Sequence, residues 1–292
     1  MHGEGRFTWV VFMEGLLFAL ATVISTALLR ISFKYCATNG KSPWTTLILY
    51  HIGGALVLLP FLGVPSLAQL SQQQLLLLLT TGVLFALAAF LDILAMKHID
   101  ASSGEIFHTL TFIISVAAGF LMFHESCSLS KVIGTLIIAV GILYEARQSI
   151  FTTSHAFFYK MGSAALIATS MVITKQLTAT TPSEVIILSG FIVPGALYML
   201  IGWRTILEIP GVVRSSNGIL LAVPILDALS YTFAIKALTI GEMSTTYMIF
   251  QTTISAVFVI EVILNGWQRE TYLRRAVSAG LCMFGAILAL VA

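Results

Sequence analysis

Charge is scarce in this sequence, and its scarcity excludes most soluble folds. Asp, Glu, Lys and Arg make up 10% of the 292 residues, whereas apolar residues make up 58%. Because a soluble domain carries about 25% charged residues, we expect an integral membrane protein. The net charge of +2 is too small to indicate nucleic-acid binding, and no basic cluster with interleaved aromatic residues is present. We therefore expect no nucleic acid among its partners.

Cysteine is also rare, and its spacing excludes the chemistry that it commonly supports. Cys36, Cys127 and Cys282 lie in different segments and form no CxxC pair, so we expect neither a disulfide framework nor a metal site. The HExxH pattern is absent, and spacing alone identifies no nucleophile with its base. The sequence thus predicts neither an enzyme nor a bound cofactor.

Long apolar runs make up most of what remains. A helix needs about 20 apolar residues to cross a bilayer, and the sequence holds roughly ten such runs. We predict an all-α integral membrane protein with ten transmembrane helices near residues 9–29, 43–60, 75–96, 104–123, 132–144, 158–176, 183–203, 218–237, 244–264 and 273–292. The first run is predicted to be a retained helix rather than a signal peptide, because Glu14 interrupts its apolar region and the run continues past Ala21.

The two halves of the chain resemble each other. Ala95-Met96-Lys97, followed by a polar turn, is repeated about 140 residues later as Ala234-Ile235-Lys236, again before a polar turn. Five runs per half is an odd number, so the halves must be inverted relative to each other, with a substrate site near the midplane where they meet. We predict residues 1–146 as the first five-helix repeat and residues 147–292 as the second.

Positive charge is unevenly divided between the two predicted membrane faces. Eleven of the 15 Lys and Arg residues, among them Arg30, Lys34 and Lys160, fall on one side. The positive-inside rule places this richer side in the cytoplasm and both termini outside.

The order of these elements resembles the drug/metabolite transporter superfamily, and within it the EamA-type ten-helix transporters. The resemblance is carried by the Ala-x-Lys elements and by Phe-His-Glu125, which is followed by Gly134 and Gly141. The chain departs from the pattern near Thr111 and Gln251, where such proteins often carry a proline, and at His51, where many carry arginine. The resemblance implies a multi-pass secondary transporter of a bacterial plasma membrane that works by alternating access. It also implies cytosolic termini, in contrast to the charge count.

Ionisable and polar side chains inside the runs are the candidates for substrate binding, because a charge within a membrane is costly and usually functional. Glu105 and His108 share one helical face, and the Tyr231 ring, one turn from Asp227, could contact a cation. The predicted substrate-binding residues are Glu14, His51, Asp92, Glu105, His108, Asp227, Tyr231 and Gln251.

Acidic residues outnumber basic ones well inside the runs, so we expect an acidic cavity. Such a cavity would take a small cationic or zwitterionic solute, for example an amino acid or an amine, and its carboxyls would suit protons as a coupling ion. Several alternatives stay open at this point. Each residue could instead hold helices together, as an internal pair of Glu105 with His108 would. A flippase for a lipid or a lipid-linked sugar is the other transport function. In the surrounding membrane lipid, the protein could be a monomer or a homodimer.

Overall fold

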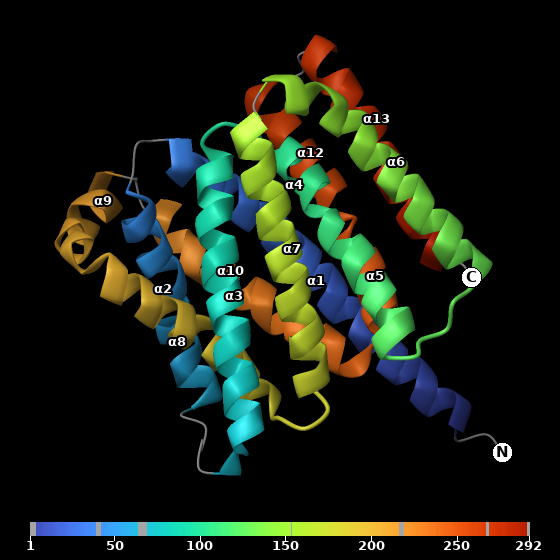
Figure 1. Ribbon diagram of the computed structural model, residues 1–292, viewed down its shortest axis with the longest axis horizontal. Coiled ribbons are helices and arrows are strands. Elements are labelled where there is room, and N and C mark those ends of the chain that lie inside the picture. Colours follow the sequence, from blue (N-terminus) through green and yellow to red (C-terminus); the bar gives the residue numbers. More distant parts are fainter. Residues whose placement is uncertain are drawn as a thin grey trace.

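The computed structural model describes residues 4–38, 42–63, 69–152, 154–215, 219–266 and 269–290. Over these ranges the chain is helical and contains no strand, which confirms the predicted all-α class (Figure 1). In chain order the elements are α1 (Glu4–Thr38), α2 (Pro43–Leu62), α3 (Gln72–Met96), α4 (Ala101–His108), α5 (Leu110–Met122), α6 (Leu129–Thr152), α7 (Ser154–Leu177), α8 (Ser183–Ile201), the 3-10 helix η2 (Trp203–Glu208), α9 (Ile209–Ser215), α10 (Ile219–Ile240), α11 (Met243–Phe250), α12 (Thr253–Asn265) and α13 (Arg269–Leu290).

Nine segments of the described chain are long and apolar enough to cross a membrane. They are Met13–Thr38, Pro43–Leu62, Gln72–Met96, Ala101–Met122, His155–Leu177, Ser183–Ile201, Leu220–Ile240, Met243–Asn265 and Tyr272–Ala289. The predicted number of ten is not confirmed. The remaining predicted run, 132–144, lies in α6, a helix of 24 residues that packs along α13 at one edge of the bundle (Figure 1).

The helices of the two halves contact each other in matching pairs. α1 of the first half corresponds to α7 of the second, and α3 corresponds to α10. The contact of α1 with α10 thus has its counterpart in the contact of α7 with α3. In the same way, α1 contacts α12 and α7 contacts α5. α2 pairs with α8, and α6 pairs with α13. The predicted fourth and ninth runs are each divided, into α4 and α5 at Thr109 and into α11 and α12 at Gln251 and Thr252. The same contacts therefore occur twice when the halves are exchanged.

Charged side chains stabilise the helix ends inside the bundle, again in matching pairs. Lys34 Nζ donates hydrogen bonds of 2.7 and 2.8 Å to carbonyl oxygens at the C-terminal end of α3, and Lys175 Nζ makes the same two bonds at the end of α10. The Glu125 carboxylate accepts from two backbone N–H groups at the start of α11, at 2.6 and 2.9 Å, and Glu261 accepts from one at the start of α4, at 3.3 Å. Both arrangements satisfy backbone groups that have no partner within the helix.

The structure differs from the sequence pattern at three places. α1 continues beyond the predicted run 9–29 to Thr38, because no glycine or proline interrupts it after Arg30. Glu125 caps α11 rather than α6, the helix that follows it in the chain. Glu261 is buried beside α4, although it lies close to the end of its own apolar run.

The α6–α13 pair depends on glycine for its close approach. A Cβ built on Gly285 would lie 2.5 Å from the carbonyl oxygen of Gly134, and one built on Gly141 would lie 2.9 Å from Cys282 Sγ. Small residues allow two membrane helices to approach until their backbones touch. Gly280, on the same helix α13, has no heavy atom within 4 Å of its built Cβ.

We predict opposite effects for the same substitution at two positions of α13. Gly285→Ala should lower the free energy of unfolding by about 1–3 kcal/mol, because the added methyl group must push a backbone carbonyl aside. Gly280→Ala should be neutral or stabilising by up to about 1 kcal/mol, since alanine is the better helix former. Thermal unfolding of the purified variants in detergent measures both changes. Equal melting temperatures for the two variants would contradict the close packing.

Candidate substrate-binding site

A cavity of about 150 Å³ lies inside the bundle and is lined by helices of both halves. Its walls come from α1, α2, α3, α4, α5, α7, α8, α10, α11 and α12. None of the lining residues comes from α6 or α13. The α6–α13 pair therefore packs outside the helices that form the cavity.

The cavity brings together most of the residues that the sequence singled out. The predicted residues that line it are His51, Asp92, Glu105, His108, Asp227, Tyr231 and Gln251. Glu14 is not among them, and its side chain is exposed on α1. The lining positions of α1 recur every three or four residues from Thr22 to Phe33, which is one face of the helix. Glu14 lies off this face.

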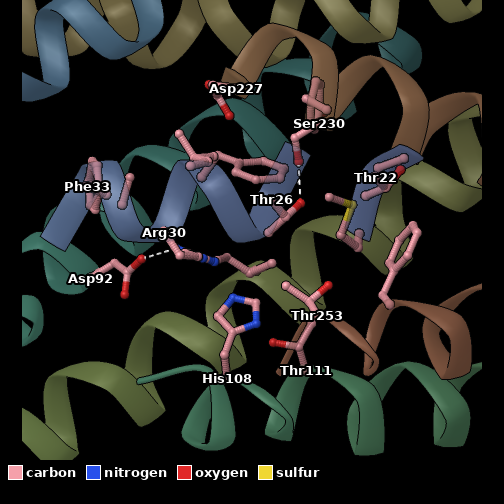
Figure 2. Close-up of a pocket in the computed structure, with 18 of the residues that line it drawn as sticks. Thr22, Thr26, Arg30, Phe33, Asp92, His108, Thr111, Asp227, Ser230 and Thr253 are labelled. Carbon is pink, nitrogen blue, oxygen red and sulfur yellow. Dashed lines mark hydrogen bonds and ion pairs between the residues drawn. The ribbon is translucent and has the colours of Figure 1, made fainter. Parts of the chain in front are cut away.

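Four largely buried charges form one network in and beside the cavity, and Figure 2 shows the pair that Arg30 makes with Asp92. Arg30 of α1 pairs with Asp92 of α3, and its Nε lies 2.7 Å from Glu105 Oε1 of α4. Lys160 of α7, whose side chain is 0% exposed, pairs with the other oxygen of Asp92. Two cations and two carboxylates thus cancel, and the network joins four helices.

This network corrects the expectation of an acidic cavity. Arg30 was assigned to a loop and Lys160 to a membrane face, yet both lie among the spanning helices. The spacing from Thr22 and Thr26 to Arg30 is a helical repeat of four, which could have placed Arg30 on the cavity face. No comparable signal identifies Lys160, because its carboxylate partner lies on another helix.

Asp227 is the carboxylate that this network leaves over. It lines the cavity from α10 and is 7% exposed. Among the side chains that the structure describes, no Lys or Arg lies within ion-pair distance of it. Its neighbour across the cavity wall is Tyr50, whose hydroxyl interacts with the carboxyl group. Figure 2 places Asp227 on the far side of Arg30 from His108.

Aromatic rings surround Asp227 on the α2, α8 and α10 side. The ring centroids of Tyr50 and His51 are 4.5 Å apart, and those of Phe191 and Tyr231 are 5.6 Å apart. Phe85 of α3 contacts Tyr231 edge to face at 5.3 Å. All five rings line the cavity. The negative faces of such rings attract cations.

Several uncharged polar groups of the cavity have no hydrogen-bond partner within the described chain. His51 is 3% exposed, and neither of its ring nitrogens is hydrogen-bonded. The Nε2 atom of His108 is also buried without a partner. By contrast, the hydroxyl groups of Thr26 and Ser230 bond each other at 2.5 Å (Figure 2). Because a charged imidazolium at His51 would be buried without compensation, we treat this side chain as neutral.

Comparison with known proteins supports the predicted resemblance. The model of the EamA-like transporter family matches residues 13–144, somewhat less than half of the chain. The match confirms the resemblance over these residues and is consistent with the drug/metabolite transporter superfamily. Together with the long apolar helices, it supports a multi-pass membrane protein. No curated protein matches the sequence significantly.

Solved structures support the fold over nearly the whole chain. Among solved structures, 28 chains match. One, titled "Crystal structure of protein", has a TM-score of 0.69 and 18% sequence identity, and the superposition covers 95% of this chain and 97% of that one. At this level of identity the similarity establishes a common fold and nothing about the substrate.

We predict that Lys160 is required for stability and that its role is electrostatic. Lys160→Met should lower the free energy of unfolding by about 3–5 kcal/mol, because it leaves three buried charges with a net negative balance. The double variant Lys160→Met/Asp92→Asn should recover a large part of the loss, since Arg30 and Glu105 then remain as a neutral pair.

A matched substitution at a half-exposed pair provides the control. Lys236 Nζ lies 3.3 Å from Glu184, and both side chains are more than a third exposed. Lys236→Met should therefore cost at most about 1 kcal/mol. Chemical unfolding in detergent micelles measures all three variants. A double variant no more stable than Lys160→Met would show that lost packing, rather than unbalanced charge, causes the effect.

Proposed function

We propose that this protein is a secondary transporter that moves a small cationic or zwitterionic solute across its membrane by alternating access. The binding site is the cavity around Asp227. The observation that carries the proposal is an unpaired, buried carboxylate in a cavity that lies between the two halves of a bundle. Carboxylates deep in a membrane protein are rare and usually line a substrate or ion pathway.

The two halves, residues 1–146 and 147–292, form five-helix repeats of opposite orientation in this proposal. The exchange of helix contacts between the halves supports it, as do the two divided helices and the paired devices at the helix ends. Transporters built from inverted repeats bind substrate at the repeat interface and often use discontinuous helices there. α6 supplies the tenth span.

In an alternating-access cycle, one gate closes the cavity toward each side of the membrane. We propose that the two gates differ in charge, because the two halves carry different residues at matching positions. Arg30 lies four residues before Lys34, and the matching position before Lys175 is Met171. Glu105 lies five residues after Asp100, and the matching residue after Glu242 is Tyr247. The ion network therefore has no charged counterpart in the second half at these positions. In the proposed cycle, one gate is ionic and the other is apolar and aromatic.

A flippase for lipids is the less suitable function. A lipid phosphate needs a cation that is free to bind it. Arg30 is the arginine among the described lining residues, and its positive charge is already balanced by Asp92 and Glu105. Asp227 suits a cationic group, or a proton that exchanges with it.

We predict that Asp227→Asn abolishes solute-dependent uptake. A counterflow screen with radiolabelled amino acids and amines in proteoliposomes identifies the solute for the wild-type protein. The variant should then transport it at least about 30-fold more slowly, the effect of removing one partner of a buried charge pair, while its melting temperature stays at or above that of the wild type.

Glu184→Gln is the matched control, since it changes the same functional group at an exposed helix end. It should transport at the wild-type rate. Wild-type transport by Asp227→Asn would remove Asp227 from the mechanism. Counterflow of no solute by the wild-type protein would contradict the proposed function itself.

The orientation in the membrane remains a prediction, and Cys127 offers a direct test. With the buried Arg30 and Lys160 omitted, nine Lys and Arg residues still fall on one side and four on the other. The positive-inside rule then keeps the α5–α6 connection, which contains Cys127, outside the cell. Cys127 is exposed, whereas Cys36 and Cys282 are buried.

A membrane-impermeant maleimide should therefore label the wild-type protein in intact cells. In Cys127→Ser/Lys97→Cys the exposed thiol is moved to the opposite end of the bundle, at the α3–α4 connection, and labelling should require lysed cells. The reverse pattern would establish cytosolic termini.

A further inference from the structure

We infer that the cavity selects organic monocations, amines without a carboxylate, over zwitterionic amino acids. This inference rests on the proposed function and narrows its substrate class. It follows from three features of the cavity: its charge balance, its aromatic wall and its unpaired neutral polar groups.

The charge balance of the cavity leaves one negative charge and no free positive charge. Arg30 and Lys160 are matched by Asp92 and Glu105, so the network is neutral. With the histidines uncharged, Asp227 leaves a balance of −1 among the described ionisable groups of the cavity and its network. A bound monocation restores neutrality, whereas a zwitterion adds a carboxylate for which the described lining residues offer no unpaired cation.

The carboxylate of an amino acid would meet Arg30 as a guanidinium group whose charge is already balanced by two carboxylates. Arg30 Nη1 already donates to Asp92, and its Nε lies 2.7 Å from Glu105. Displacing either carboxylate would leave that carboxylate buried and unpaired, which costs far more than a new pair with the same guanidinium group returns. The network is therefore a neutral wall of the site rather than its anion-binding part.

The wall beside Asp227 is suited to an ammonium group. The Tyr50 hydroxyl group interacts with the carboxylate, the Tyr231 side chain lies close enough to interact with it electrostatically, and Phe191 and Phe85 extend the aromatic surface from Tyr231. An ammonium group between a carboxylate and aromatic faces gains both ion-pair and cation–π attraction in a site from which water is largely excluded.

The rest of the cavity offers neutral hydrogen-bonding groups to the tail of such a cation. His51 is buried beside Tyr50 with both ring nitrogens unpaired, and the hydroxyl-bearing side chain of Thr253 is buried in the wall of the same cavity. A neutral imidazole supplies one donor and one acceptor, so these groups can receive a hydroxyl or amide group. An engineered cavity of about 150 Å³ binds benzene. We therefore expect the uncharged part of the cation to be about as large as a benzene ring.

Two probe series with constant skeletons and different charges test this inference. The first is phenethylamine, phenylalanine and 3-phenylpropionate, and the second is isobutylamine, valine and isovalerate. Each series compares a cation, a zwitterion and an anion at neutral pH. Binding is measured by the thermal stabilisation of the purified, full-length protein in detergent, and transport by counterflow in proteoliposomes.

We expect the amine of at least one series to bind about 30-fold or more tightly than its amino acid, and the anions not to bind. Asp227→Asn should lose this preference and bind the amine about as weakly as the amino acid, while Glu184→Gln should retain it.

The possible outcomes separate this inference from the proposed function. Equal or tighter binding and transport of the amino acid would overturn the monocation selectivity and leave a zwitterion transporter. An amine preference that persists in Asp227→Asn would overturn the role of Asp227 in it. Binding and transport of no member of either series would overturn the selectivity, whereas the proposed function fails only if the counterflow screen finds no solute.

Discussion

The ion network of Arg30, Asp92, Glu105 and Lys160 is the constraint on which the site depends. Each of these charges would cost several kcal/mol to bury alone, so none can be placed among the membrane-spanning helices without the others. The pairing fixes α1, α3, α4 and α7 relative to one another. It also determines the chemistry of the rest of the cavity, because Asp227 carries the unbalanced charge only while both buried cations are occupied.

The backbone imposes a second constraint, since helices that end or divide inside a bilayer expose polar groups that no water reaches. Lysine and glutamate side chains meet this need in both halves, at the ends of α3 and α10 and at the starts of α4 and α11. These hydrogen bonds stabilise the helix ends and occur in each half. The ion network does not recur, so the scaffold is nearly symmetric whereas the lining of the cavity is not.

The sequence was sufficient to predict the membrane class, the family and most of the helices, because these depend on composition, run length and the order of local elements. It also identified seven residues that line the cavity, since an ionisable group inside an apolar run is conspicuous. It could not pair Arg30 and Lys160 with their carboxylates, because these contacts join different helices. The divisions at Thr109 and Gln251 were missed for a related reason: neither carries the proline or glycine that marks a break. Glu14 was included because it lies in an apolar run, but its position around α1 directs it away from the cavity.

An unpaired carboxylate in an otherwise neutral site has a consequence for the proposed cycle. Moving an uncompensated charge through the low-dielectric middle of the bundle is costly, so the empty site with an ionised Asp227 should reorient slowly. The site becomes neutral when Asp227 holds either a proton or the ammonium group of a solute. In the proposed cycle both loaded forms would change their access from one side of the membrane to the other, whereas the empty ionised form would do so only slowly. Exchange of a cation for a proton would then follow from this charge balance, without a second ion-binding site.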